Sequence, residues 1–310
     1  MWFINVGNTD VFHLFYMFII YSFAGWLMET VLVSVQSKEF VNRGFMNGPF
    51  CPIYGTGALA VYFFLTPVQN NIFLVIILGS IIATIIEYFT SFVMEKLFNA
   101  KWWDYSDKKF NLQGRICLSI SICWGFLTAF MLKVLQPLSL KLINNIPRTL
   151  GEFLGTIITA YFISDIVLTV FNILSINSKL EVISNIRKEF REKLEEIPKF
   201  NKKQEFIDKL EIFKNNNIKN SEFFTDFKVY VENEIKNYYN EKHEFYIEKR
   251  ENIENTINEL KNKLDKHKEY LKRTNSIEKR IIKAFPNIKS TKFTEDMSEL
   301  KEYLRNKRRR

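Results

Sequence analysis

Apolar residues are concentrated in the first 176 positions, where five stretches are separated by short polar segments. A helix needs about 20 mostly apolar residues to cross the hydrocarbon core of a bilayer. The stretches that meet this length are 11–35, 72–94, 116–135 and 150–176. The remaining stretch, 52–68, is shorter and contains Pro52, Gly55 and Gly57, so we expect either a full span or a tilted, re-entrant segment. The pattern predicts an all-α, polytopic membrane helix bundle of about five spans.

After residue 176 the pattern changes to alternating charges with helical periodicity. Apolar residues recur at three- and four-residue steps from 179 to 196, and Pro198 ends that predicted helix. Further helices are predicted near 204–214 and from about 222 to 273, where the last part has heptad-like spacing. We therefore expect a transmembrane helical domain at 1–176 and a cytoplasmic, charged helical or coiled-coil tail at 177–310.

The distribution of Lys and Arg predicts the orientation. Cytoplasmic loops of membrane proteins carry an excess of these residues. The loops at 36–51 and 95–115 hold two and five of them, whereas the N-terminus and the 67–71 loop hold none and the 136–149 loop holds two. This bias predicts the N-terminus outside and the C-terminal tail in the cytoplasm. We also expect no cleaved secretory signal, because the N-terminus lacks a basic n-region.

Three acidic residues fall within predicted spans, where an ionisable side chain costs roughly 2.5–3.5 kcal/mol near the helix centre. With the predicted topology, Glu29, Glu87 and Asp165 can converge with the two basic loops. Those loops supply arginines, whose planar guanidinium fits carboxylates and phosphates, together with amides and an aromatic side chain. We predict a cytoplasm-facing polar site. Its substrate-binding residues are Glu29, Asn42, Arg43, Glu87, Trp103, Asp104, Asn111, Arg115 and Asp165.

The same residues have structural interpretations, which the sequence leaves open. Glu29 and Glu87 either serve a site or neutralise Arg43 and Arg115 as ion pairs. Asp165 either functions in the site or hydrogen-bonds between helices. Trp102 and Trp103 form either a wall of the site or a membrane-interface belt. The Gly- and Pro-rich segment at 44–57 either lines a pocket or makes a compact turn.

Cysteine and histidine give little reason to expect a cofactor. Cys51, Cys117 and Cys123 lack the spacing of a disulfide framework or a zinc site. The three histidines are far apart in the sequence. We expect no metal, no cofactor and no catalytic residues.

Long motifs in the membrane half resemble one known family. The matching stretches are GWLMET (25–30), FVNRGFMNGPFCPIYG (40–55), EYFTSFVMEKLF (87–98) and WWDYSDKKFNLQGRICL (102–118). With them, the chain over roughly 12–175 resembles bacterial multi-pass membrane proteins described as putative ABC-transporter type IV permeases. The positions carried over are Glu29, Asn42, Arg43, Gly44, Pro49, Glu87, Trp103, Asp104, Asn111, Gly114 and Arg115.

The resemblance implies a permease-like component of the bacterial cell membrane, working with a separate ATPase subunit. No G-x-x-x-x-G-K-[ST] phosphate loop occurs in the chain, so it does not hydrolyse ATP by that route. Five spans make a thin conduit, which favours a homo-oligomer. The alternatives are a membrane-embedded lipid-headgroup binder or enzyme, and a scaffold that presents a coiled coil. We expect a protein that is not an enzyme more than an enzyme.

Other partners follow from the tail. Its charges are mixed in sign rather than gathered on one basic face, so we expect no nucleic acid. The terminal RNKRRR at 305–310 is either a contact to anionic lipid or a solvated end.

Overall fold

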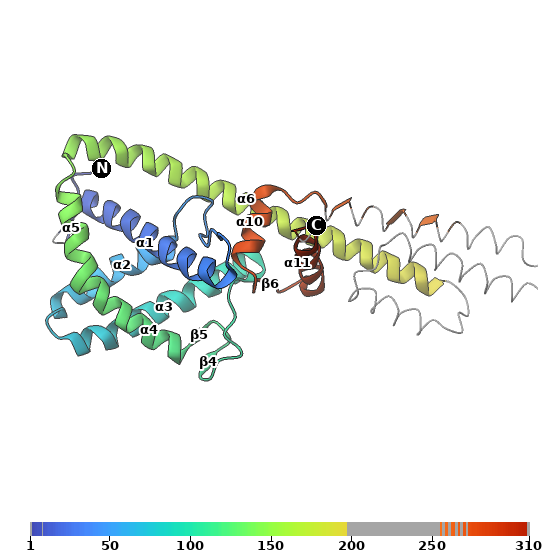
Figure 1. The fold of residues 1–310 in the computed structure, drawn as a ribbon, viewed down its shortest axis with the longest axis horizontal. Helices are drawn as coiled ribbons and strands as arrows, with labels where there is room; N and C mark the ends of the chain where they lie inside the picture. The colour runs from blue at the N-terminus through green and yellow to red at the C-terminus, as the bar shows by residue number, and fades with distance from the viewer. Residues whose placement is uncertain are drawn as a thin grey trace, which may run out of the picture. The chain divides into compact units, whose positions relative to one another are not determined.

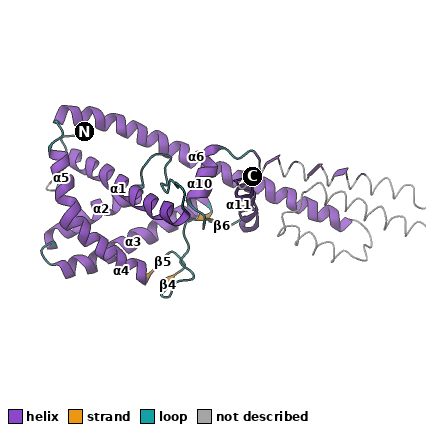
Figure 2. Ribbon diagram, viewed as in Figure 1, coloured by secondary structure: helices purple, strands orange, loops and turns teal. Residues whose placement is uncertain are grey.

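The computed structural model describes residues 2–7, 9–196 and 272–308, with scattered positions between 255 and 270. Helices dominate, and the strands are two residues long each (Figures 1 and 2). The described chain falls into two compact units. One combines Met1–Leu180 with Thr274–Arg310, and the other is Glu181–Arg273. The predicted helices at 204–214 and most of 222–273 lie outside the described residues, as do 309 and 310.

Within the residues that the structure describes, four helical stretches are long and apolar enough to cross a membrane: Val11–Ser37, Ile72–Phe98, Leu118–Asn144 and Arg148–Ile186. They are formed by α1 (Val11–Ser37), α3 (Ile72–Phe98), the pair α4 (Leu118–Phe130) and α5 (Gln136–Asn144), and α6 (Arg148–Glu196). The all-α polytopic bundle predicted from the sequence is therefore confirmed.

The short apolar stretch forms α2 (Pro52–Leu65) followed by a 3₁₀ turn at Thr66–Val68. At a rise of 1.5 Å per residue, this segment covers roughly 25 Å, slightly less than the hydrocarbon core. Pro52 occupies the first helical turn, where its missing N–H costs no hydrogen bond.

The helix ends follow ordinary capping chemistry. The Asp10 side chain accepts a hydrogen bond from the His13 N–H at the start of α1, and Asn71 accepts one from Leu74 N–H at the start of α3. Lys38 and Asn99 end α1 and α3 in the left-handed conformation, which releases the chain into the two polar loops.

Between α4 and α5 the helix widens into a π-helical turn at Met131–Leu135. Pro137 follows this turn, and its ring removes one backbone donor from the helical ladder. A wider turn beside a proline lets the helix continue without a break. Leu118–Asn144 thus runs as one apolar stretch.

The helices approach closely where small residues meet. A Cβ at Gly79 of α3 would lie 2.5 Å from Thr128 Cγ2 of α4, so only glycine fits there. One cluster of the hydrophobic core lies in the half of the bundle near the N-terminus and includes Phe12, Met17, Leu65 and Ile143. Further buried apolar residues, such as Met46, Trp102 and Ile281, lie at the opposite end. Large apolar side chains on the outside of the helices stay exposed, as expected where lipid replaces water as the solvent.

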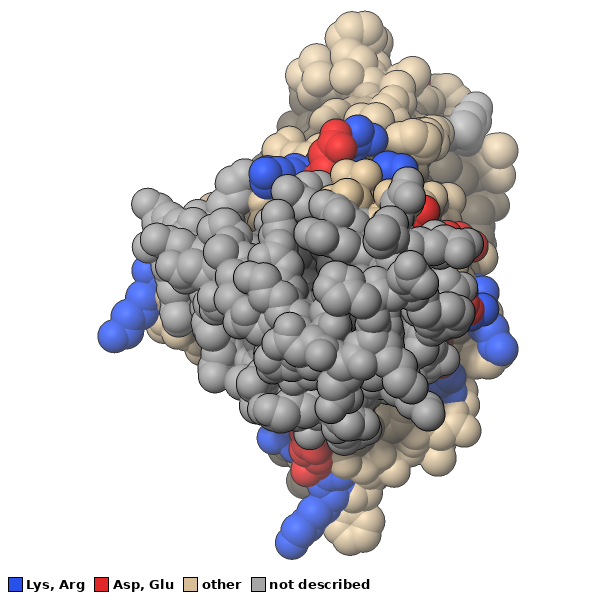
Figure 3. Space-filling model, turned by 90° about the vertical axis from the view of Figure 1, so that its right-hand side faces the viewer, with Lys and Arg blue, Asp and Glu red and all other residues tan. Residues whose placement is uncertain are grey.

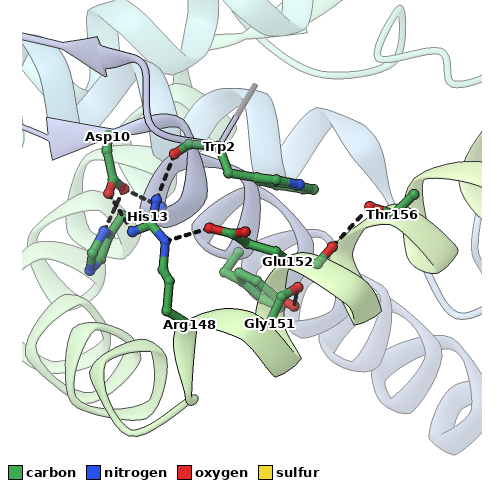
Figure 4. A network of polar contacts seen from close by, with 8 residues as sticks. Trp2, Asp10, His13, Arg148, Gly151, Glu152 and Thr156 are labelled. Atoms are coloured by element: carbon green, nitrogen blue, oxygen red, sulfur yellow. Dashed lines mark hydrogen bonds and ion pairs between the residues drawn. The ribbon is translucent and has the colours of Figure 1, made fainter.

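At the end near the N-terminus, a polar network joins the start of α1 to the start of α6 (Figure 4). Arg148 Nη1 contacts Asp10 Oδ2 at 2.7 Å, its Nε contacts Glu152 at 3.0 Å, and its Nη2 donates to a backbone carbonyl near the N-terminus. The strands β1 (Asn5–Val6) and β2 (Thr9–Asp10) pair antiparallel immediately before α1.

At the opposite end lie the two loops that follow α1 and α3, together with the C-terminal segment (Figure 1). The 99–117 loop contains β3 (Ala100–Lys101), β4 (Asn111–Leu112) and β5 (Ile116–Cys117). The C-terminal segment contains α10 (Ser276–Ala284), β6 (Lys289–Ser290) and α11 (Thr294–Arg308). β4 pairs with β5, and β3 pairs with β6, both antiparallel.

Within the second unit, the described residues show charged contacts. Lys263 Nζ lies 2.8 Å from Glu189 Oε2, and Lys188 faces Glu192 one helical turn along α6. The helix predicted from 179 is present to Glu196 as the continuation of α6.

Candidate functional site

The first cluster joins the end of α1, the 38–51 loop and the start of α2. Tyr54 Oη donates to Glu29 Oε1 at 2.6 Å, and Arg43 Nε lies 3.6 Å from Glu29 Oε2. Gly25 lets the Tyr54 ring lie directly on α1, because a Cβ there would clash with the ring. From the sequence, Glu29 could serve a site or pair with Arg43, and the structure contains the ion pair.

The second cluster surrounds Glu87, which is only 6% exposed. Tyr105 Oη donates to its Oε1 and Trp124 Nε1 donates to its Oε2, both at 3.1 Å. The Trp124 ring also packs edge-on against Tyr54, with 5.7 Å between ring centroids. One aromatic pair therefore separates the Glu29 carboxylate from the Glu87 carboxylate.

Arg115 pairs with an acid other than Glu87. Its Nη2 lies 2.9 Å from Glu95 Oε2, and its guanidinium carbon lies 5.4 Å from the Tyr88 ring centroid. Among the described residues, the ion pairs give Glu87 no basic partner. The Glu87–Arg115 ion pair, one of the interpretations of the sequence, is therefore absent among the described residues. Arg115 pairs instead with Glu95, two turns further along α3.

Asp165 of α6 fixes the 38–51 loop. Its Oδ1 accepts from Asn47 N–H at 3.1 Å and its Oδ2 accepts from Gly48 N–H at 2.7 Å, while the side chain is 5% exposed. Gly48 has no room for a side chain, because a Cβ would meet the Tyr161 hydroxyl. A carboxylate held by two backbone donors at membrane depth replaces the hydration that the loop has lost.

Asn42 organises the same loop from within. Its Oδ1 accepts from Trp26 Nε1 at 2.8 Å and from Gly44 N–H at 3.0 Å, and its Nδ2 donates to Asn47 O at 2.8 Å. The amide therefore ties α1 to both arms of the turn. In this structure Asn42 is a positioning residue for Arg43.

The predicted site residues in the 99–117 loop mostly make hydrogen bonds within that loop. Asp104 accepts from Ser106, Asn111 Nδ2 donates to Lys108 O at 2.7 Å, and Asn111 Oδ1 accepts from Gly114 N–H at 3.1 Å. Gly114 has φ +70°, and a Cβ there would also clash with Asp104. Trp103 Nε1 donates to the Arg115 carbonyl at 2.9 Å, which places Arg115 against α3.

The C-terminal segment covers these loops, and the sequence did not predict it. Arg280 donates to Gly44 O at 2.8 Å and Phe45 O at 3.2 Å, and Arg43 Nη1 donates to Ala284 O at 2.5 Å. Burial lowers the pKa of the Arg280 guanidinium to about 10. The Phe285 ring lies beneath Arg43, 4.4 Å from its guanidinium carbon.

The same segment also reaches the second loop. Lys289 Nζ lies 2.7 Å from Asp104 Oδ2, and this contact lowers the pKa of the Asp104 carboxyl well below its usual range. β6 pairs with β3, and Trp102 packs against Phe285 with 4.7 Å between ring centroids. Trp102 is 3% exposed, so it is a packing residue rather than part of an interfacial belt.

Two contacts tie the start of the C-terminal segment to α6. Lys179 Nζ contacts both oxygens of Glu278, at 2.7 and 2.6 Å, and Asn275 Nδ2 donates to Asn172 Oδ1 at 2.7 Å. Asn275 and Glu278 also form a reciprocal capping box at the start of α10. The chain thus leaves the first unit after Leu180 and re-enters it at a point that is tied to the same stretch of α6.

This return had a sequence signal. Asn275 followed by Glu278 is a capping-box pattern, and apolar residues follow at helical spacing up to Pro286. The pattern predicts α10 but not its docking, which depends on polar contacts to residues at least 99 positions earlier.

The structure therefore gathers Glu29, Asn42, Arg43 and Asp165 around the 38–51 loop, and Glu87, Trp103, Asp104, Asn111 and Arg115 around the 99–117 loop. The C-terminal segment bridges the two. No group of three or more His, Cys, Asp or Glu side chains within the described ranges is placed to hold a metal ion. The carboxylates mostly accept hydrogen bonds from neutral donors, an arrangement suited to binding polar or cationic groups and to accepting protons.

Comparison with known proteins gives one match. The family model for putative ABC-transporter type IV proteins matches residues 16–170, half of the chain. No curated protein matches the chain. No solved structure matches it either. The matched range contains all nine predicted site residues together with α1 from Tyr16 onward, α2 to α5 and the first half of α6. The chain therefore belongs to the putative ABC-transporter type IV family, a group of membrane proteins of transporter type.

Proposed function

We propose that this chain is a permease-like subunit of an ABC-transporter-type assembly, with a polar site that faces the cytoplasm. The observation that carries the proposal is the placement of the intramembrane acids. Glu29, Glu87 and Asp165 come from three different helices, and all three lie at the end of the bundle that holds the two motif loops. Such residues are expensive at membrane depth, and they commonly mark a path for ions or polar solutes.

The charge distribution supports the cytoplasmic assignment of this end. The 36–51 and 95–115 loops carry seven Lys or Arg between them. The C-terminal segment adds Arg280, Lys283 and Lys289, which contact those loops. Figure 3, which views the molecule from the right-hand side of Figure 1, shows both basic and acidic side chains among the described residues. With the positive-inside rule, this end faces the cytoplasm of a bacterial cell and the N-terminus faces outward.

The assembly needs a separate ATPase subunit, because the chain carries no phosphate-loop sequence. The surface formed by the two loops and α10 is the natural contact for such a subunit, since it lies on the proposed cytoplasmic side. A second copy of the chain would supply further spans for a conduit.

The first test is purification of the tagged protein from its native membrane in mild detergent, with identification of partners at fixed stoichiometry. We expect an ATPase subunit whose hydrolysis rate changes when this chain is present. An intact, monodisperse protein without an ATPase partner, in repeated preparations, would contradict the transport proposal.

Charge-neutralising variants test the site itself. Glu29→Gln, Glu87→Gln and Asp165→Asn should each reduce solute-stimulated ATPase activity of the assembly, whereas Glu152→Gln should not. Glu152 is the matched control, since it is an acid on the same helix as Asp165 but at the opposite end of the bundle. Full activity in all three site variants, with normal membrane insertion, would remove the site from the proposal.

A lipid-headgroup binder is the second candidate, and one observation favours it. The Nε atoms of Arg43, Arg115 and Arg280 are buried without a hydrogen-bond partner at this end of the bundle. Phosphate is a ligand that guanidinium groups recognise well. Lipid retained by the purified protein, identified by mass spectrometry, would support this candidate if Arg43→Gln and Arg115→Gln lose it.

A further inference from the structure

The β4–β5 hairpin exposes apolar side chains where a water-facing loop would be polar. Phe110 is 80% exposed and Leu112 is 53% exposed. Phe110 lies in the left-handed turn that directly precedes β4, with φ 53°, and Leu112 is the second residue of β4. The hairpin therefore has an apolar face that the described part of the chain does not cover.

This face continues the lipid-facing surface of α4. Leu118, Ile122, Phe126 and Phe130 recur every four residues along α4, and each is between 47% and 61% exposed. A stripe of this kind lies along one side of a helix. Leu118 N–H donates to the Phe110 carbonyl at 3.2 Å, so the hairpin begins where the stripe ends. The exposed apolar side chains of α4 and those of the hairpin are thus neighbours, joined by this backbone hydrogen bond.

Basic residues accompany the apolar face. Lys108 and Lys109 are exposed and directly precede Phe110. Neighbouring aromatic and basic groups are typical of segments at the boundary between headgroups and acyl chains. Lysines at this depth attract anionic headgroups.

The hairpin is also held firmly in place. Asn111 bonds within the loop, Gly114 makes the left-handed turn, and Trp103 Nε1 fixes the Arg115 carbonyl. Arg115 in turn lies against Tyr88 on α3. Because the backbone is already ordered by these contacts, insertion of its apolar residues needs little further loss of conformational freedom.

We propose that the β4–β5 hairpin is a membrane-interface anchor. Phe110 and Leu112 enter the acyl region beside the start of α4, and Lys108 and Lys109 bind the phosphates of anionic lipids. The partner is the lipid surface of one leaflet rather than a soluble protein. This function is separate from the proposed transport site, because none of these four side chains contacts Glu29, Glu87 or Asp165.

A depth measurement tests the anchor. The full chain, with the exposed Cys123 replaced by Ser, is given one new cysteine by Phe110→Cys, labelled with an environment-sensitive fluorophore and reconstituted into vesicles of phosphatidylcholine with phosphatidylglycerol. The same protein without the new cysteine gives the background from the buried Cys51 and Cys117. Lys292→Cys, at an exposed position before α11, is the matched water-facing control.

We expect the fluorophore at 110 to be quenched by lipids that carry a nitroxide high on the acyl chain and to be protected from iodide in solution, with the reverse at 292. Leu112→Cys should repeat the result at 110 and covers the case in which Phe110→Cys folds poorly. Replacing both lysines by Gln should weaken lipid quenching at 112 several-fold in anionic vesicles but not in pure phosphatidylcholine. Iodide quenching at 110 and 112 equal to that at 292 would overturn the anchor. Protection from iodide without lipid quenching would overturn it in favour of a protein contact, and insensitivity to the lysine substitutions would overturn the headgroup contact.

Discussion

The two ends of the helical bundle use charged residues in different ways. At the end near the N-terminus, Arg148 pairs with Asp10 and Glu152, and the three side chains are 18% to 35% exposed (Figure 4). At the opposite end, Glu87, Asp165 and Glu278 are 6% exposed or less. Two of these three acids, Glu87 and Asp165, form no ion pair with Lys or Arg within the described residues and accept hydrogen bonds from neutral donors.

The difference indicates two roles for charged residues: holding helix ends together at one end of the bundle, and making specific contacts at the other. Partly exposed ion pairs contribute less energy than buried ones and hold helix ends together at low cost. Buried carboxylates with neutral partners destabilise the fold unless every oxygen is bonded, so a protein keeps them where a specific contact requires them. Substitutions at the two ends should therefore differ in size.

The largest effect should follow Glu278→Ala. Glu278 is fully buried, and its carboxylate contacts both the Lys179 ammonium and the backbone N–H of Asn275, the N-cap residue of α10. The substitution removes both of these contacts. Breaking a buried pair costs about 3 kcal/mol or more. Hydrogen exchange of residues 276–308 should accelerate by two orders of magnitude or more. Glu152→Ala, at the exposed end, should leave exchange throughout the chain nearly unchanged, and equal effects of the two substitutions would contradict the comparison.

The next effect should follow Asp165→Ala. This change leaves the buried N–H of Gly48 and the partly buried N–H of Asn47 without their acceptor, at about 1–3 kcal/mol each. The melting temperature in detergent should fall, and the 38–51 loop should become open to protease. Asp165→Asn keeps one acceptor and should lose about half as much. An unchanged melting temperature in Asp165→Ala would show that the loop does not depend on this carboxylate.

A smaller, pH-dependent effect is expected at the exposed end. Burial alone would raise the pKa of the Asp10 carboxyl, but hydrogen bonds from Arg148 and His13 outweigh it and lower the pKa to about 2. A carboxyl with a lowered folded-state pKa stabilises the protein above its unfolded pKa near 4, and this contribution is lost as the pH falls towards 2. Arg148→Gln should therefore lower the melting temperature modestly at pH 6 and hardly at all at pH 2. A constant difference across this range would assign the effect to packing instead.

The smallest effect concerns Lys301 of α11. Burial lowers the pKa of its ammonium to about 8, while its Nζ donates to Pro286 O at 2.8 Å and also to Ile288 O. A lysine with a lowered folded-state pKa binds fewer protons in the folded state, so stability rises with pH between about 8 and 10.5. Exchange at α11 should slow over this interval, after correction for the intrinsic rate. Lys301→Met should remove that dependence, and a slope that survives in Lys301→Met would point to another group.

The sequence was informative wherever the signal was local. Apolar length predicted α1, α3, α6 and the α4–α5 helix, and the weak stretch at 52–68 became the short α2. The acids in the spans and the motif loops were also expected to converge, and the structure brings Glu29 to Arg43 and Asp165 to the 38–51 loop. These outcomes depend on periodicity and on the cost of charge in lipid.

What the sequence did not show were contacts between distant segments. Arg280 binds two carbonyls of the 38–51 loop, and β6 pairs with β3 over two residues each, which leaves no periodic pattern to detect. The partner of Arg115 was also mistaken in one interpretation, because Glu87 and Glu95 both lie on α3 and only the loop geometry selects Glu95. Side chains that bind backbone carbonyls are especially hard to predict, since every residue offers that acceptor.

The tie between α6 and the start of α10 has a consequence for how this chain can vary in length. Lys179–Glu278 and Asn172–Asn275 bring together the points where residues 181–273 leave and return. These two contacts hold the start of α10 on α6 and do not involve any residue of the interval itself. Insertions and deletions in that interval are therefore nearly neutral for the membrane part, so relatives can differ widely there while keeping the same membrane bundle and C-terminal segment.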